Sequence, residues 1–299
     1  MMNPTRFHGA WPALLTPASN DGGVHEGVLR DLTDYLIEKG IGGLYLCGST
    51  GEGVFLSVAE RKQVVEVVLD QTCDRVPVIV HVGCVATRHS IELARHARAL
   101  GADGVASILP PFRRGPEETI LHYERIAAAA FDVPFYPYLF GGETDALSLM
   151  QELLGRIPNI GGAKYTGSDM YELSAIVNLK DEGWTIFSGM DQQCVFAAMS
   201  GSPANIGSTL NVMPGLYREL RSAYEQGDLA RANDLQGRAN QVLRVIQRFG
   251  FFGALFETVR NLGFECGHPR LPHAPFPADR RGEFRRALEA VGFFEIAAM

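Results

Sequence analysis

Residues 78–108 read VIVHVGCVATRHSIELARHARALGADGVASI, a stretch that contains a strand, a helix and a second strand in succession. Val78–Val82 is a short, β-branched apolar run, as a buried strand requires. Ser90–Leu100 repeats its apolar residues with helical spacing and is followed by Gly101, where a helix C-cap belongs. Gly104–Ile108 is again short and apolar. Such a unit predicts a parallel sheet with helices covering it.

The same alternation continues on both sides of this unit, from residue 10 to about residue 225. It predicts strands at Ala10–Leu15, Gly43–Cys47, Val78–Val82, Gly104–Ile108, Pro134–Tyr138, Gly161–Lys164, Thr185–Ser188 and Ala204–Ile206. Eight parallel strands close a barrel, so we predict an α/β fold, a (β/α)8 TIM barrel, over residues 1–227.

Beyond residue 228 the pattern becomes purely helical, with a Pro-rich interruption at Pro269–Pro277. We interpret residues 228–299 as a C-terminal helical extension of the same domain. The alternative is a doubly wound open sheet with a helical second domain. Residues 16–23 read TPASNDGG and lack the G-x-G-x-x-G that a dinucleotide-binding sheet carries after its first strand, which argues against this alternative.

Composition excludes several classes of function. The 299 residues are 46% hydrophobic and carry a formal charge of -7, so no basic surface is available for nucleic acid or an anionic membrane. Five scattered cysteines without a C-x-x-C pair indicate a reduced protein without a metal site of that type. We expect no signal peptide, because the apolar stretch within residues 1–17 is broken by Pro12, and no later apolar run reaches about 18 residues. We therefore expect a cytoplasmic protein that acts on small molecules.

The end of the second predicted strand reads Gly48-Ser49-Thr50-Gly51-Glu52-Gly53. In a parallel barrel the active site lies at the carboxyl ends of the strands. Glycines here allow backbone N–H groups to face an anion, and the hydroxyls of Ser49 and Thr50 can donate to a carboxylate. The alternative interpretation is an ordinary Gly-rich turn. A P-loop is excluded because no Gly-Lys-Ser/Thr follows.

Lys164 differs from the other three lysines of the chain, because it alone ends an apolar strand. An amine in a pocket with little water is protonated less readily and attacks ketones. The alternative is a lysine that extends to solvent at the barrel rim. We favour a catalytic Lys164 because the Ser49-Thr50 loop and Tyr136 also end strands on the same face.

The remaining candidates also follow strands. The fifth predicted strand ends in Phe135-Tyr136-Pro137-Tyr138, where Pro137 favours extended backbone at Tyr136. Tyr136 is either a proton shuttle or a core aromatic. His81 and Cys84 lack further ligands at metal spacing, so packing is the better interpretation. The active face also receives Thr166, Gly189, Asp191, Gln192 and Ser208, which could otherwise be caps or turn residues.

With these residues assembled, the chain resembles the N-acetylneuraminate lyase and dihydrodipicolinate synthase superfamily of pyruvate-dependent Schiff-base enzymes. The resemblance covers almost the whole chain and rests on Gly48-Ser49-Thr50-Gly51-Glu52, on Lys164, and on Tyr136 at 28 residues before it. It is strongest for the N-acetylneuraminate lyase branch, which is echoed by the segments at residues 81–85, 188–191 and 206–213. The resemblance implies a homotetramer that needs no metal or organic cofactor.

Departures from the family pattern bear on the substrate. The usual Tyr-Asn-x-Pro is here Tyr136-Pro137-Tyr138-Leu139, and the arginine that synthase members use for a second carboxylate is Gly141. The loop at residues 110–114 is shorter than the family loop that lends a tyrosine to a neighbouring subunit, which puts the usual proton relay in doubt. Gln192 stands where the lyases have Glu.

The resemblance implies that Lys164 forms an imine with a 2-keto acid, Ser49 and Thr50 hold its carboxylate, and Tyr136 moves the proton. Thr166, Gly189, Asp191, Gln192 and Ser208 would face the distal end of the substrate, and the products would be pyruvate and an aldehyde. Other activities on this machinery are a 2-keto-3-deoxy sugar-acid aldolase or dehydratase, a dihydrodipicolinate synthase, and a deaminase of a cyclic hydroxyproline derivative. The non-enzymatic alternative is a sensor that binds a keto acid.

Overall fold

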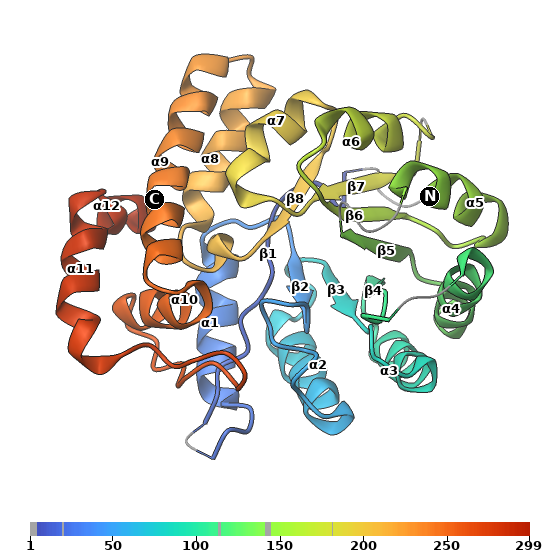
Figure 1. Ribbon diagram of the computed structural model, residues 1–299, viewed down its shortest axis with the longest axis horizontal. Helices are drawn as coiled ribbons and strands as arrows, with labels where there is room; N and C mark the ends of the chain where they lie inside the picture. Colours follow the sequence, from blue (N-terminus) through green and yellow to red (C-terminus); the bar gives the residue numbers. More distant parts are fainter. Residues whose placement is uncertain (1–4, 20, 113–114, 141–144, 181) are drawn as a thin grey trace.

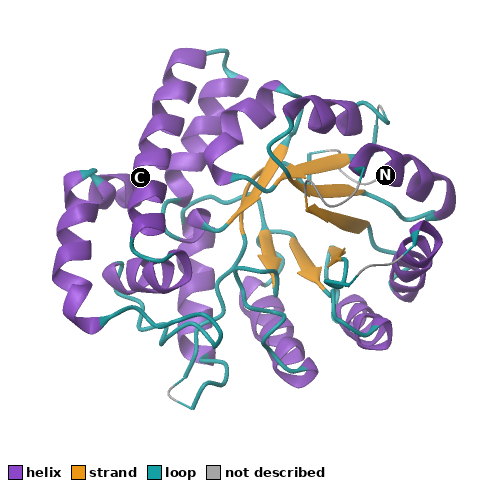
Figure 2. Ribbon diagram, viewed as in Figure 1, coloured by secondary structure: helices purple, strands orange, loops and turns teal. Residues whose placement is uncertain are grey.

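The strands form one parallel barrel, as predicted (Figures 1 and 2). The computed structural model describes residues 5–19, 21–112, 115–140, 145–180 and 182–299. The sheet order is β1-β8-β7-β6-β5-β4-β3-β2, and a parallel bridge between Ala13 and Tyr45 joins its two ends. A doubly wound open sheet is thereby excluded. The strands are β1 Gly9–Pro12, β2 Leu44–Leu46, β3 Val78–His81, β4 Gly104–Ile108, β5 Phe135–Phe140, β6 Gly162–Thr166, β7 Thr185–Ser188 and β8 Ala204–Gly207.

Helices surround the barrel and continue beyond it (Figure 2). Gly40 and Gly101 have φ values of +75° and +84°, the left-handed conformation expected of helix C-caps. The helices that alternate with the strands are α1 Glu26–Glu38, α2 Val58–Thr72, α3 Thr87–Ala99, α4 Pro116–Ala129, α5 Ala146–Arg156, α6 Met170–Val177, α7 Cys194–Met199 and α8 Pro214–Glu225. Short 3-10 helices are η1 Asp191–Gln193, η2 Thr209–Asn211 and η3 Ala278–Arg280.

The C-terminal extension consists of α9 Leu229–Arg248, α10 Phe251–Asn261, α11 Arg281–Ala290 and α12 Phe293–Ala298. It lies against one side of the barrel, where α9 packs along α8 (Figure 1). Leu235, Val242 and Ile246 of α9 belong to the same buried cluster as the apolar residues of the barrel helices. Within the described ranges, no helix is long and apolar enough to span a membrane.

Aromatic side chains fill the lower layer of the barrel. Trp11 and Tyr136 both pack edge-on against Phe187, with ring centroids 5.3 and 5.4 Å from its own, and Phe7 lies 5.8 Å from Tyr136. All four belong to one buried cluster. Because these rings fill the amino-terminal half of the interior, a ligand can enter only the layer above them, where the strands end.

Candidate active site

Lys164 lies in the upper layer of the barrel interior, buried to 5% exposure. Its Nζ is 3.8 Å from the ring centroid of Tyr138 and 5.0 Å from that of Tyr45. The β5–β6 register places Tyr138 directly beside Lys164. Because side chains alternate between the two faces of a strand, this paired position points both side chains to the same face, the barrel interior. Lys164 therefore lies in an aromatic enclosure at the carboxyl ends of the strands.

Of the two β5 tyrosines, Tyr138 and not Tyr136 lies next to Lys164. The expected position of Tyr136 at the strand end is wrong, because β5 continues to Phe140 and the residue at the top of the interior lies later in the chain. Two residues along a strand correspond to about 6.6 Å. Tyr136 thus falls in the aromatic floor, next to Phe7 and Phe187. Burial there raises the pKa of its phenol.

The surroundings of Tyr138 lower the pKa of its phenol. Burial by itself would raise the pKa of this phenol, but the positive charge of Lys164 and the polar side chains of Thr166, Lys164 and Ser49 outweigh it, so the pKa lies below its ordinary value. The buried hydroxyl of Thr166 faces the Tyr138 phenol, but the two groups do not form a hydrogen bond of normal geometry. The site thus combines an amine with an acidified phenol, the two groups that imine chemistry needs.

The loop after β2 places Ser49 and Thr50 at the same end of the barrel. Ser49 is exposed, whereas Thr50 is buried and its Oγ1 is 2.6 Å from Oγ of Ser208. Thr16 donates to the carbonyl of Gly51 at 2.8 Å, which holds the loop against the chain after β1. A Cβ on Gly48 would lie 2.7 Å from the Tyr45 ring, so this position needs glycine.

His81 connects the strands below this loop. Its Nδ1 is 3.0 Å from the carbonyl of Cys47, and its Nε2 accepts from the backbone N–H of Ile108 at 3.0 Å. This pattern requires a neutral ring with the proton on Nδ1. Burial, together with the charges of Arg61 and Lys164, holds the pKa of His81 well below its ordinary value. His81 is a packed structural residue, as the sequence predicted.

Asp191 and Gly189 line the opposite side of the interior, after β7. Oδ2 of Asp191 accepts from both the backbone N–H and the hydroxyl of Thr209 at 2.8 Å, whereas Oδ1 is buried and has no partner in the part of the chain that the structure describes. Burial raises the pKa of Asp191, which the bonds from Thr209 and the charge of Lys164 oppose. A Cβ on Gly189 would lie 1.8 Å from Oγ1 of Thr166 and 3.3 Å from Cε of Lys164.

The five residues assigned to the distal end of the substrate lie at the end of β6 or follow β7 and β8. Gly189 is adjacent to both Thr166 and Lys164, the charge of Lys164 acts on Asp191, and Ser208 bonds to Thr50. Among the described residues, the side chain of Gln192 makes a single polar contact, from Nε2 to Sδ of Met190 at 3.9 Å, which leaves its amide available to a ligand.

Two groups that the sequence did not reveal hold these loops. Gln236 of α9 donates from Nε2 to the carbonyl of Asp191 at 3.0 Å. Arg270 makes an ion pair from Nη1 to Oε2 of the fully buried Glu52 at 3.0 Å. No sequence motif marks these two side chains, because each binds a backbone group or a charged group that lies more than forty residues away along the chain.

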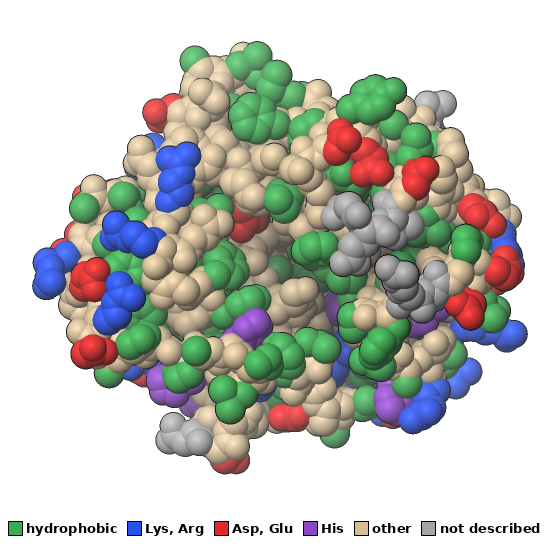
Figure 3. Space-filling model, viewed as in Figure 1, with side chains coloured by type: hydrophobic (Ala, Val, Ile, Leu, Met, Phe, Trp, Pro, Cys, Tyr) green, Lys and Arg blue, Asp and Glu red, His purple; other side chains and the backbone are tan. Residues whose placement is uncertain are grey.

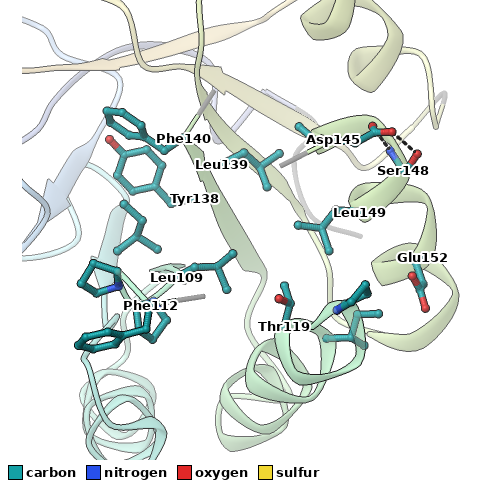
Figure 4. A pocket seen from close by; sticks show the side chains of 16 residues that line it. Leu109, Phe112, Thr119, Tyr138, Leu139, Phe140, Asp145, Ser148, Leu149 and Glu152 are labelled. Atoms are coloured by element: carbon teal, nitrogen blue, oxygen red, sulfur yellow. Dashed lines mark hydrogen bonds between the residues drawn. The ribbon is translucent and has the colours of Figure 1, made fainter. Parts of the chain in front are cut away.

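A cavity of about 920 Å³ opens beside Tyr138, between α4 and α5. Figure 4 shows Leu139 and Leu149 facing each other across it, with Tyr138 and Phe140 to one side. Its polar margin includes Asp145, which caps α5 by accepting from Ser148 (Figure 4). In Figure 3 the face of the molecule is hollowed near its centre, and charged side chains lie mainly toward the periphery.

Gly141 and the Arg113-Arg114 pair, on which two departures from the family pattern rest, lie outside the described residues. Across the parts of the chain that are described, no three His, Cys, Asp or Glu side chains gather as metal ligands would.

A TIM barrel with a buried lysine on the sixth strand, a phenol against it and a hydroxyl-rich loop opposite defines a lyase of the imine-forming class. Comparison with known proteins gives the family. The model of the Dihydrodipicolinate synthetase family matches residues 6–291. The N-acetylneuraminate lyase of Mus musculus is 32% identical over 278 residues, which cover 89% of this chain and 87% of the mouse protein. That of Escherichia coli (strain SMS-3-5 / SECEC) is 34% identical over 256 residues, covering 84% and 85%.

Solved structures agree. The Proteus mirabilis N-acetylneuraminate lyase superposes with a TM-score of 0.91 at 29% identity, covering 96% of this chain and 99% of that one. A Ruminococcus gnavus sialic acid aldolase catalytic lysine mutant gives 0.93 at 27% identity, covering 98% of each chain. The protein belongs to the dihydrodipicolinate synthetase family and is a class I, pyruvate-dependent lyase similar to sialic acid aldolases. An enzyme, and not a keto-acid sensor, is therefore the correct class.

Proposed function

We propose that the protein cleaves a polyhydroxylated 2-keto acid to pyruvate and an aldehyde through an imine on Lys164. The observation that carries the proposal is the position of Lys164, whose Nζ is buried 3.8 Å from the Tyr138 ring centroid. N-acetylneuraminate is the leading substrate, and a shorter 2-keto-3-deoxy sugar acid is the second, because Gln192 replaces the Glu of the lyases.

In this mechanism Nζ of Lys164 attacks the C2 carbonyl while Ser49, Thr50 and their backbone N–H groups bind the adjacent carboxylate. Loss of water gives a protonated imine, which accepts the electron pair of the C3–C4 bond. Tyr138 takes the role that the sequence assigned to Tyr136: as phenolate it accepts the proton of the C4 hydroxyl while that bond breaks. Protonation of the enamine at C3 and hydrolysis of the imine then release pyruvate and restore the amine.

The distal half of the substrate is assigned to the side of the site after β6, β7 and β8. Asp191 Oδ1 and Thr166 Oγ1 are buried without a hydrogen-bond partner among the described residues, and such groups gain most from a ligand that satisfies them. A substrate hydroxyl can donate to the first and exchange a hydrogen bond with the second. Gln192 and Ser208 extend this polar surface, and Gly189 leaves room between it and Lys164.

Homotetrameric assembly and a cytoplasmic location form part of the proposal. The support for the tetramer is the family resemblance, and light scattering of the purified enzyme would test it. Catalysis is proposed to require neither a metal nor an organic cofactor, since the protonated imine formed on Lys164 serves as the electron sink.

Borohydride trapping tests the central step. Reduction in the presence of pyruvate should fix one adduct on Lys164, located by peptide mass spectrometry, and Lys164→Ala should lose both the adduct and turnover. A panel of keto acids with detection of released pyruvate then identifies the substrate. An adduct on Lys39, Lys62 or Lys180, or no adduct, refutes the proposal.

A further inference from the structure

Beyond the barrel itself, the C-terminal extension bonds to both of the loops that the proposed function assigns to substrate. We infer that it positions them separately: Arg270 sets the loop for the keto-acid carboxylate, and Gln236 sets the turn for the distal half. The inference rests on the proposed function, because the two loops are given their roles there. Arg270 and Gln236 are positioning residues, since their bonds go to the loops.

Arg270 holds the carboxylate loop at Glu52. This glutamate is fully buried, follows Thr50 by two residues, and has a φ of +55°, which a non-glycine residue adopts only when its surroundings enforce it. The backbone N–H of Arg270 donates to Oε1 of Glu52 at 2.8 Å, and Nη1 donates to Oε2 at 3.0 Å.

The same guanidinium also donates to the carbonyls of Thr16 and Gly23, each at 3.0 Å. It thus ties the carboxylate loop to the segment after β1. The ammonium of a lysine, at the end of a flexible chain, cannot reproduce this planar set of donors. Loss of these guanidinium hydrogen bonds should therefore displace Ser49 and Thr50 relative to Lys164.

Gln236, a residue of α9, holds the turn at Asp191 and Gln192 that is assigned to the distal half of the substrate. Its side chain is 2% exposed, donates from Nε2 to the carbonyl of Asp191 and accepts at Oε1 from the N–H of Val195, both at 3.0 Å. Asn240, one turn further along α9, donates to the carbonyl of Gln192 at 3.3 Å. The two carbonyls of the turn are thus bonded to one helix, which fixes the direction of the Asp191 and Gln192 side chains.

Because Arg270 and Gln236 act on opposite ends of the substrate, substitutions at the two residues should affect pyruvate trapping differently. The test measures, for each variant, the pyruvate concentration that gives half-maximal trapping of Lys164, and kcat/KM for N-acetylneuraminate. Arg270→Lys should raise the half-maximal pyruvate concentration about tenfold, with trapping at saturation unchanged. Gln236→Met, of similar volume, should leave pyruvate trapping unchanged and lower kcat/KM about tenfold.

Phe284→Leu is the matched control. Phe284 is buried in the extension against Phe249 and Phe276, with centroids 5.1 and 4.9 Å away, so this change lowers thermal stability without touching either loop. Both activity measurements should stay as in the wild type. If Arg270→Lys does not fold, Glu52→Gln, which keeps the bond from the Arg270 backbone, should raise the pyruvate concentration in the same direction.

The outcomes distinguish the two proposals. Wild-type enzyme that forms no adduct on Lys164 refutes the proposed function. Wild-type enzyme that is trapped normally, together with an Arg270→Lys variant that leaves pyruvate trapping unchanged or a Gln236→Met variant that changes pyruvate trapping as much as kcat/KM, overturns the positioning role. An effect of Phe284→Leu as large as that of the loop variants also overturns it, because the extension would then act through stability alone.

Discussion

Replacing Tyr138 with Phe removes one hydroxyl from the site and leaves the rest of the enclosure in place. The ring that lies 3.8 Å from Nζ of Lys164 is retained, and so is its packing at the top of β5. Because the described residues make no hydrogen bond of normal geometry to this hydroxyl, the free energy of unfolding should change by less than about 1 kcal/mol. The loss of proton transfer is much larger: general acid–base catalysis contributes about 10²–10⁴-fold, or roughly 3–5 kcal/mol in the activation free energy.

Tyr136→Phe provides the control, because it makes the same chemical change two residues away on the same strand. Tyr136 lies in the aromatic floor, so kcat should stay within a few-fold of the wild type. Steady-state release of pyruvate from the preferred keto acid measures both variants, and thermal unfolding verifies that each is folded. Equal losses in the two variants, or a greater loss for Tyr136→Phe, would refute the assignment of the proton shuttle to Tyr138.

Three further changes test other parts of the site. Asp191→Asn puts an NH₂ group either at the position of Oδ1, which the described residues leave without a partner, or toward Thr209. A loss of about 1–3 kcal/mol in transition-state stabilisation should lower kcat/KM for a hydroxylated substrate roughly ten- to a hundred-fold, while pyruvate trapping persists. Activity equal to that of the wild type would show that no hydroxyl binds there. Gly189→Ala places a methyl group 1.8 Å from Oγ1 of Thr166 and should reduce trapping, and adding Thr166→Ala should restore it; failure of this rescue contradicts the steric account. The pKa of His81 is lowered in the folded state, so below pH 6.5 the unfolded state takes up a proton that the folded state does not. The free energy of unfolding should therefore fall by up to about 1.4 kcal/mol per pH unit as the pH decreases. Denaturant titrations of His81→Gln should show a weaker dependence of this free energy on pH, and an unchanged dependence would be inconsistent with a buried neutral ring.

The barrel could be predicted from the sequence because each strand–helix unit carries its own local signals. Apolar runs of fixed length, helical spacing and glycines such as Gly40 and Gly101 are all read within a few residues. The strand-end rule then placed Lys164, Ser49 and Thr50 at one end of the barrel. These inferences needed only local pattern and the topology that follows from it.

Register and long-range contacts could not be obtained in this way. Tyr136 and Tyr138 have the same inward direction, and only the length of β5 beyond Pro137 decides which one reaches Lys164. Arg270 and Gln236 contact groups 218 and 45 residues away, largely through backbone atoms that every residue carries. A pattern in the sequence cannot distinguish such side chains from others on the same polar helix or loop.

The aromatic floor formed by Trp11, Tyr136 and Phe187 has a consequence for the order in which the products depart. Under the proposed mechanism, the pyruvyl fragment is covalently attached just above these rings, while the aldehyde is held nearer the open end. The aldehyde can diffuse away once the carbon–carbon bond has broken, and pyruvate follows only after water has entered by the same opening. Cleavage is then a sequential release with pyruvate last, and by microscopic reversibility condensation must begin with pyruvate.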